Sequence, residues 1–324
     1  MAKDSRNVYF YDIHSRVRTR RYKDGELNPF PQALLAKALH DRFNANTAEV
    51  IKKKSKQSIH ISDMRLYPDR AEILIGYCDT TAADPTLVDR PKKKRRIVNK
   101  IDDEGLEHSA HVIWHFGSKS SSDPCPFYLE GAVGLGSTSI VRFVNTLLRS
   151  VSKHSSIFEI DDPEGTVTAS GAFKKIKTWP RIELTGHPSK EFVRDLKKGT
   201  LTEVEIYTES DRLKPWDANS YAVEQRRAVV IRPNEKKVVP NAWKLLTGVF
   251  SKKVTDEFEY ARVSFKTENS VARSARVFSS NLNLVNDDRY VRKEIITFEG
   301  TNLPNSFEKF HGPIIKSIRK LAGI

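Results

Sequence analysis

Three histidines lie close enough in the sequence to suggest a metal site: His108, His111 and His115. The alternating apolar residues between positions 112 and 116 predict a β-strand through this segment. On a strand, positions 111 and 115 share a face but lie about 13 Å apart at ~3.3 Å per residue, too far to share one ion. Cysteine ligands at a spacing suited to zinc are also missing. We therefore expect no metal and no cofactor here.

Carboxylates occur in three groups, at residues 102–104, 161–164 and 256–259. A metal-dependent nuclease needs converging carboxylates to hold Mg²⁺. No Pro-Asp pair and following lysine stand at nuclease spacing, and no Ser-His-Asp or Cys-His arrangement can be singled out. The sequence therefore predicts a protein without catalytic residues, and a metal-dependent nuclease stays as an alternative.

A glycine-containing turn, Gly134-Leu135-Gly136, lies between a predicted strand and a predicted helix. Backbone N–H groups and the helix dipole at such a turn can bind phosphate. The turn lacks the lysine of a Walker loop and the full spacing of a dinucleotide fingerprint. We therefore favour the simpler interpretation, in which Ser137 is the N-cap of the helix.

Clustered cations are the strongest chemical signal in the chain. Residues 1–100 hold 22 Lys and Arg against 12 Asp and Glu, which is most of the formal net charge of +14. Two clumps stand out, namely Lys52, Lys53, Lys54 and Lys56, and Lys92, Lys93, Lys94, Arg95 and Arg96. Such clumps neutralise phosphates and release counterions. They predict a nucleic-acid partner, DNA favoured, bound through its backbone with weak sequence selectivity.

Two further basic segments are candidates for the same partner. Four arginines, Arg16, Arg18, Arg20 and Arg21, fall where the sequence predicts a flexible arm, which could follow phosphates or enter a minor groove. A merely solubilising loop is the alternative for this arm. The second segment is a predicted strand pair at residues 258–266 and 272–278, which could enter a groove. It carries Arg262, Lys266, Arg273 and Arg276. The period of two puts Arg262 and Lys266 on one face and lets only one of Arg273 and Arg276 join them. The alternative for this strand pair is an exposed sheet face that carries charged side chains without a partner.

The order of predicted elements favours an α+β fold with mixed, mainly antiparallel sheets and packed helices. A hairpin is expected from residues 58–77, a loop over residues 79–100, and helices over residues 139–148, 189–198, 241–250 and 306–321. In the last helix, Pro313 predicts a kink or a restart. Residues 1–178 are expected to form a basic globular domain on which a C-terminal helix (303–324) packs. Residues 179–302 would then form a second, mobile α+β domain.

One order of segments resembles a known family. Phe30-Pro31-Gln32-Ala33-Leu34-Leu35 precedes the hairpin, Phe127-Tyr128-Leu129-Glu130-Gly131 runs into a helix, and Val230-Ile231-Arg232-Pro233 comes later. This order is similar to that of the RexA-type phage-exclusion proteins of prophages. The resemblance implies a homodimeric DNA-binding protein that acts in phage exclusion, often beside a membrane-protein partner. The chain departs from that pattern by a longer basic insertion at residues 84–101 and extra length at residues 211–225.

The composition of the chain indicates the cellular compartment. Two distant cysteines cannot build a disulfide framework, which favours a reducing compartment. No segment has the apolar run of a signal peptide or a membrane span, so we expect a cytoplasmic protein without direct membrane insertion. A basic protein-interaction module that meets an acidic partner remains a further alternative.

Overall fold

The computed structural model describes residues 4–20, 27–52, 56–117, 124–209, 226–233, 242–250, 258–285 and 289–324. Its centre is a group of antiparallel strands: β1 (Ser5–Arg18), β8 (Cys125–Glu130), β7 (Leu106–His115) and β4 (Arg70–Asp79). Strands β3 (Gln57–Leu66) and β2 (Glu49–Lys52) extend this group on one side. The expected hairpin is thus confirmed as β3–β4.

Both faces of the central strands are buried, and the alternation of side chains shows it. On β1, Tyr11 and Ile13 belong to the main core, whereas Val8 and Phe10 belong to a second apolar cluster on the other face. Trp114 of β7 is fully buried in the main core, as expected for a tryptophan beside apolar neighbours. A sheet buried on both faces needs a covering layer on each.

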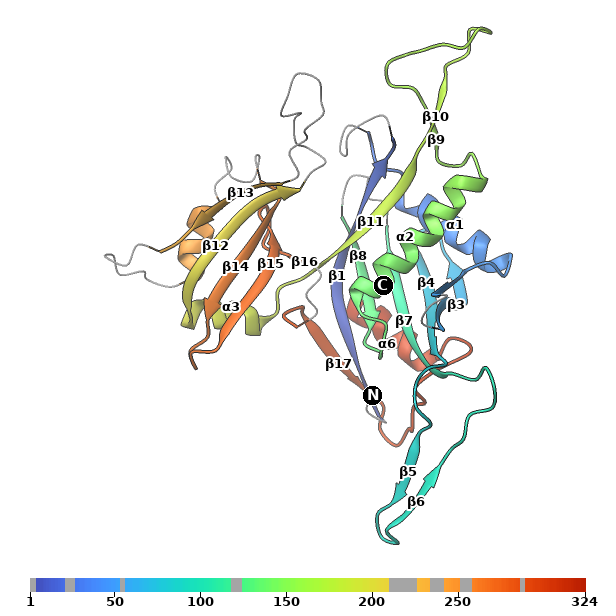
Figure 1. Cartoon of the computed structure of the whole chain (residues 1–324), viewed down its shortest axis with the longest axis vertical. Helices are drawn as coiled ribbons and strands as arrows, with labels where there is room; N and C mark the ends of the chain where they lie inside the picture. The colour runs from blue at the N-terminus through green and yellow to red at the C-terminus, as the bar shows by residue number, and fades with distance from the viewer. Residues whose placement is uncertain are drawn as a thin grey trace.

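Two helices cover the face of the main core (Figure 1). Helix α1 (Gln32–Asn44) begins after Pro31, and helix α2 (Ser137–His154) buries Ile140, Phe143 and Leu147. The apolar residues of α2 recur at three- and four-residue spacing, which makes one buried stripe and leaves the opposite side polar. The N-cap of α2 is Gly136, and Ser137 is a buried residue of the first turn, so the expected Ser137 cap is wrong.

The last helix, α6 (Gly312–Ala322), covers the other face. Ile314, Ile315 and Ile318 are buried against Val8 and Phe10. The helix starts six residues later than the expected Ser306. Pro313 sits in its first turn, where the missing N–H costs nothing, and residues before it cannot continue the helix through a proline.

The sheet continues on its other side. Strand β11 (Trp179–Gly186) pairs with β1 over eight residues, and β17 (Lys293–Thr297) also pairs with β1. Strand β16 (Leu284–Val285) joins β11 to a smaller group formed by β15 (Ala272–Phe278), β14 (Tyr260–Lys266), β12 (Thr200–Glu209) and β13 (Arg226–Ile231). Helices α3 (Lys190–Lys198) and α4 (Ala242–Val249) accompany these strands. The mainly antiparallel α+β class is therefore confirmed.

The passage between the two parts is narrow. Strand β16 pairs with β11 through Thr185–Val285 and Gly186–Leu284, and with β15 through Val277–Leu284. One sheet thus runs through both parts, and β11 and β17 pair with the larger part although they lie within residues 179–302. The division into two domains stays a prediction.

Two hairpins project from this body (Figure 1). One is formed by β9 (Glu159–Asp161) and β10 (Lys175–Lys177), and the other by β5 (Thr86–Asp89) and β6 (Lys94–Ile97). They point away from each other at opposite ends of the long axis. In the part of the chain that the structure describes, no helix is long and apolar enough to cross a membrane.

Candidate nucleic-acid interface

The second cationic clump lies on the projecting β5–β6 hairpin, here called the ribbon (residues 86–97). We expected a loop over residues 79–100, and this expectation is wrong. Leu87 and Val88 pair with Arg96 and Arg95, so the residues on the two sides of a Pro91-containing turn form an antiparallel hairpin. The sequence shows no apolar periodicity here because three of the four residues of β6 are cations.

The cations of the ribbon are exposed, and few have partners. All of Lys92, Lys93, Lys94, Arg95 and Arg96 are exposed. Among the described residues, the one ion pair of this group joins Lys92 Nζ to Asp89 at 3.7 Å. Because Arg95 and Arg96 are consecutive on a strand, their side chains leave opposite faces. The ribbon therefore presents positive charge on both faces.

The first clump lies beside the base of the ribbon. Lys52 ends β2 and is exposed, and Lys56 adopts a φ of 46° in the turn to β3. The carbonyl of Lys56 accepts hydrogen bonds from the N–H and the hydroxyl of Thr80, at 3.3 and 3.0 Å. Thr80 directly follows β4, on the way to the ribbon. The fold thus brings two clumps that are 36 residues apart to one end of the sheet, while Lys53 and Lys54 lie outside the described residues.

The predicted flexible arm is wrong for Arg16 and Arg18, which lie on strand β1. Arg18 is the last residue of β1 and pairs with Trp179 of β11. Arg16, on the same strand, forms ion pairs with Glu183 and Glu259. The arginines were read as loop residues because strand β1 carries polar side chains up to its end. Arg20 is exposed just beyond the strand, and Arg21 lies outside the described residues.

The β14–β15 pair has the predicted register but little free charge. Arg262 lies opposite Arg276, and Arg273 lies opposite Phe265, so only Arg276 joins the row of Arg262. Arg262 pairs with Glu205 of β12 at 3.4 Å. The guanidinium of Arg276 lies 4.2 Å from the Tyr260 ring centroid, a cation–π contact. This face is charged but largely compensated.

The two remaining cations of the β14–β15 pair, Lys266 and Arg273, line a hollow. The hollow, of about 570 Å³, lies near the end of the β14–β15 hairpin and is also lined by Arg289. The side chains of Lys266 and Arg273 are exposed. Lys266 shares the face of Arg262, four residues further along β14, whereas Arg273, opposite Phe265, leaves the other face.

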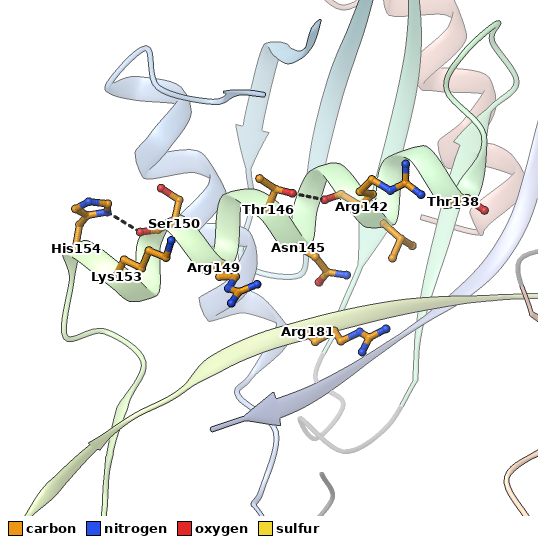
Figure 2. Close-up of a pocket in the computed structure, with 10 residues that line it drawn as sticks. Thr138, Arg142, Asn145, Thr146, Arg149, Ser150, Lys153, His154 and Arg181 are labelled. Carbon is orange, nitrogen blue, oxygen red and sulfur yellow. Dashed lines mark hydrogen bonds between the residues drawn. The ribbon is translucent and has the colours of Figure 1, made fainter. Parts of the chain in front are cut away.

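A cationic groove that the sequence analysis missed runs along the polar side of α2 (Figure 2). It has a volume of about 620 Å³ between α2 and β11. Its lining includes the cations Arg142, Arg149, Lys153 and Arg181 together with His154, and it contains no carboxylate. Among the described residues, none of its Arg and Lys side chains has an ion-pair partner. We call these residues, with Asn145, the α2 groove.

Asn145 fixes the geometry of the α2 groove. Its amide donates to the carbonyl of Ile182 at 2.9 Å and accepts from the N–H of Ile182 at 2.7 Å. This double hydrogen bond holds α2 against β11 and sets Arg181 beside the helix. Arg149 in turn lies over the Trp179 ring at 5.6 Å. Like charges are thereby held together, and the repulsion is relieved when an anion binds.

A sequence signal for this groove existed. Residues 137–154 contain three cations and a histidine but no Asp or Glu. Positions 142, 149 and 153 are separated by seven and four residues, which places them on one side of a helix. Arg181 could not have been found this way, because its approach to α2 depends on tertiary packing.

The histidines of β7 do not converge, as their strand placement predicts. His111 is fully buried and its Nδ1 lies 2.6 Å from Glu130, which also pairs with Arg6. His115 lies 3.9 Å from Asp69 instead. Within the described residues, no three His, Cys, Asp or Glu side chains are placed to hold one metal ion.

Cys78 lies near a histidine and a carboxylate, the groups that can activate a thiol. Cys78 lines a hollow with His60 and Glu107, whose side chains are 3.3 Å apart. Burial, followed by the nearby charge of Glu107, raises the pKa of the Cys78 thiol. A thiol that stays protonated is a poor nucleophile. This arrangement does not support thiol chemistry.

Comparison with known proteins gives no relative: no protein-family model, no curated protein and no solved structure matches the chain.

Proposed function

We propose that this protein binds nucleic acid, with DNA as the favoured partner, through the phosphate backbone. The observation that carries the proposal is the ribbon, where five consecutive exposed cations project from the body and one has a carboxylate partner among the described residues. A two-stranded ribbon has the size to enter a major groove. Lys52 and Lys56 at its base add charge at the same end.

The contact is expected to be weakly selective for sequence. Three of the five cations are lysines, which lack the planar fork that reads guanine. Lysine contacts to phosphates release counterions instead, and the affinity then falls steeply with salt. Binding would therefore be strong at low salt and similar for unrelated sequences.

The test is a fluorescence-anisotropy titration of labelled duplex DNA, single-stranded DNA and duplex RNA across a series of salt concentrations. Changing Lys92, Lys93, Lys94, Arg95 and Arg96 to Gln should reduce the log–log salt slope on duplex DNA by ~0.9 for each lost phosphate contact. A control variant changes the exposed Lys309, Lys316 and Lys320, on or before α6, to Gln, and its slope is compared per charge removed. An unchanged slope in the ribbon variant would remove the ribbon from the interface.

The wider biological role is proposed on the resemblance alone. A RexA-type protein would act in the cytoplasm as a homodimer in phage exclusion, beside a membrane protein. Plating efficiency of phages on cells that express the chain, with and without the ribbon substitutions, tests this role. Equal plaque counts with and without the chain, over a panel of phages, would count against it. Adding Mg²⁺ to the DNA samples tests the nuclease alternative in parallel.

A further inference from the structure

We propose that the α2 groove binds a second nucleic-acid segment, so that one molecule bridges two duplexes. This inference rests on the proposed function, because it assumes that the ribbon holds the first segment. It is carried by the placement of two cationic surfaces on different elements and by the absence of carboxylates from the lining of the α2 groove.

The two cationic surfaces lie on different elements of the fold. The ribbon projects from the ends of β4 and β7 at one end of the long axis, and α2 lies across the middle of the helical layer (Figure 1). The cationic end of α2, with Lys153 and His154, is the end from which the chain runs on to the opposite hairpin, β9–β10. The groove therefore does not extend the surface of the ribbon.

An acidic hollow adjoins the base of the ribbon on the face of the sheet that α6 covers, opposite the face covered by α2. Its lining includes Glu49, Glu107 and Glu308. Glu49 begins β2, three residues before Lys52, and Glu107 is the second residue of β7, just after the ribbon. The other wall of the hollow includes Phe43 of α1. These carboxylates disfavour a phosphate chain on the α6 face at the base of the ribbon.

The α2 groove has the chemistry of a phosphodiester site. Arg142, Arg149 and Arg181 offer planar forks, which suit phosphate oxygens. Asn145, through its two bonds to Ile182, holds the helix and strand that carry them. The donors are spread along about three turns of helix, as a chain of phosphates requires and a single phosphate does not. Nδ1 of His154 lies 2.9 Å from the carbonyl of Ser150, which orients the ring at the end of the groove.

The experiment measures bridging separately from binding. One duplex is immobilised on beads, the protein is added at low salt, and recovery of a second, labelled duplex is counted. The groove variant changes Arg149, Lys153 and Arg181 to Gln, and the matched control changes Lys309, Lys316 and Lys320 to Gln. Both remove three positive charges from exposed positions. Far-UV circular dichroism and thermal unfolding confirm that each variant is folded.

The expected results are specific. The wild-type chain and the control variant recover the second duplex, and sedimentation shows two duplexes per chain at saturation. The groove variant still binds the first duplex through the ribbon, within about threefold of the wild-type affinity, but holds one duplex per chain and loses at least tenfold in recovery. The ribbon variant loses recovery as well, because bridging needs both surfaces.

Other outcomes overturn the inference in distinguishable ways. A groove variant that bridges like the wild type would show that bridging comes from two chains, each with one duplex. Loss of all binding in the groove variant, at one duplex per wild-type chain, would show a single interface that includes α2. Absence of DNA binding by the wild-type chain would refute the proposed function itself. Competition by free nucleotides at equal phosphate concentration would assign the groove to a small ligand.

Discussion

The backbone N–H of His311 donates a hydrogen bond to Nε2 of His111 across 3.0 Å. Because that nitrogen accepts, the proton of the neutral ring lies on Nδ1, which faces Glu130 at 2.6 Å. Glu130 also pairs with Arg6 at 2.9 Å, and all three side chains of this network are at most 1% exposed. The network joins β1, β7 and β8 to the residue that precedes the last helix.

Removal of the last helix should therefore destabilise the whole larger part. Truncation after Leu303 would expose the second apolar cluster, including Phe10 and Ile113, and leave the buried polar network without its partner. We expect a protein that aggregates or binds the dye ANS strongly, with loss of DNA binding as a consequence. Size-exclusion chromatography and dye fluorescence check this. Truncation after Ala322, which removes two exposed residues, is the control and should behave like the wild type.

A second prediction concerns the ion pair that anchors the same helix. Arg319 binds the fully buried carboxylate of Glu72 through two hydrogen bonds of 2.7 Å, and Arg70 adds a third at 3.0 Å. Replacing Arg319 by Gln leaves Glu72 with Arg70 alone, so we expect a loss of about 2 kcal/mol in the free energy of unfolding. Lys320→Gln, one residue further along α6, should cost less than about 0.5 kcal/mol. Urea unfolding at pH 7 measures both; equal midpoints would contradict the anchoring role.

The pH dependence of this anchor has a defined sign. Burial alone would raise the pKa of Glu72, but the hydrogen bonds from Arg319 and Arg70 outweigh it and lower the pKa. The folded state thus binds the proton less readily than the unfolded state. The stabilisation is complete above the ordinary glutamate pKa and is lost as the pH falls through the lower, folded value. Urea midpoints between pH 7 and pH 3 should therefore fall less in Arg319→Gln than in the wild type.

Two histidines should add a separate loss of stability in mildly acidic solution. Burial lowers the pKa of His14, which stacks on Phe278 with ring centroids 5.6 Å apart, and burial likewise lowers that of His311. The unfolded state then binds protons at a pH where the folded state does not. Stability is complete above the ordinary histidine pKa of about 6.5 and declines as the pH falls below it. In His14→Gln, the midpoint of unfolding should change less between pH 7.5 and pH 5.5; an unchanged slope would exclude His14 as a source.

The sequence predicted the elements whose apolar pattern is complete. Alternation identified β7 and the β3–β4 hairpin, and helical spacing identified α2, because each of these buries one or two full faces. The register of Arg262, Arg273 and Arg276 followed from the same period of two. These features depend on local spacing, which the sequence contains.

The sequence did not reveal features that depend on partners elsewhere in the chain. All residues of the ribbon are exposed, so its strands bury no apolar face and resembled a loop. Arg16 was read as part of a free arm because its partners, Glu183 and Glu259, lie more than 160 residues away. The α2 groove requires Arg181 to approach Arg149, and that approach is produced by the bonds between Asn145 and Ile182.

Loss of the Asn145 bonds should therefore loosen the α2 groove. Asn145→Ala leaves the N–H and the carbonyl of buried Ile182 without these partners, at a cost of about 2 kcal/mol. Thr146→Ala, the control, removes an exposed hydroxyl that bonds to the Arg142 carbonyl of the same helix, and should cost less than about 0.5 kcal/mol. Urea unfolding measures both variants. If the two variants were equally stable, Asn145 would not be the link between α2 and β11.

The final prediction concerns the turn that leads into α2. Gly134 has a φ of 76°, and a Cβ at this position would overlap the ring of Tyr77 on β4. Gly165 has a φ of 69°, and nothing lies within 4 Å of its Cβ position. Gly165→Ala therefore measures the backbone cost alone, about 1 kcal/mol.

Gly134→Ala should cost the backbone strain and the overlap together, about 3 kcal/mol in total. Thermal and urea unfolding of both variants give the difference that belongs to the Tyr77 contact. The double variant Tyr77→Ala/Gly134→Ala has no ring at position 77 and therefore no overlap. Relative to Tyr77→Ala alone, Gly134→Ala should then cost about as much as Gly165→Ala does in the wild type. An equal cost of the two single glycine substitutions would show that the turn and Tyr77 are not in contact in solution.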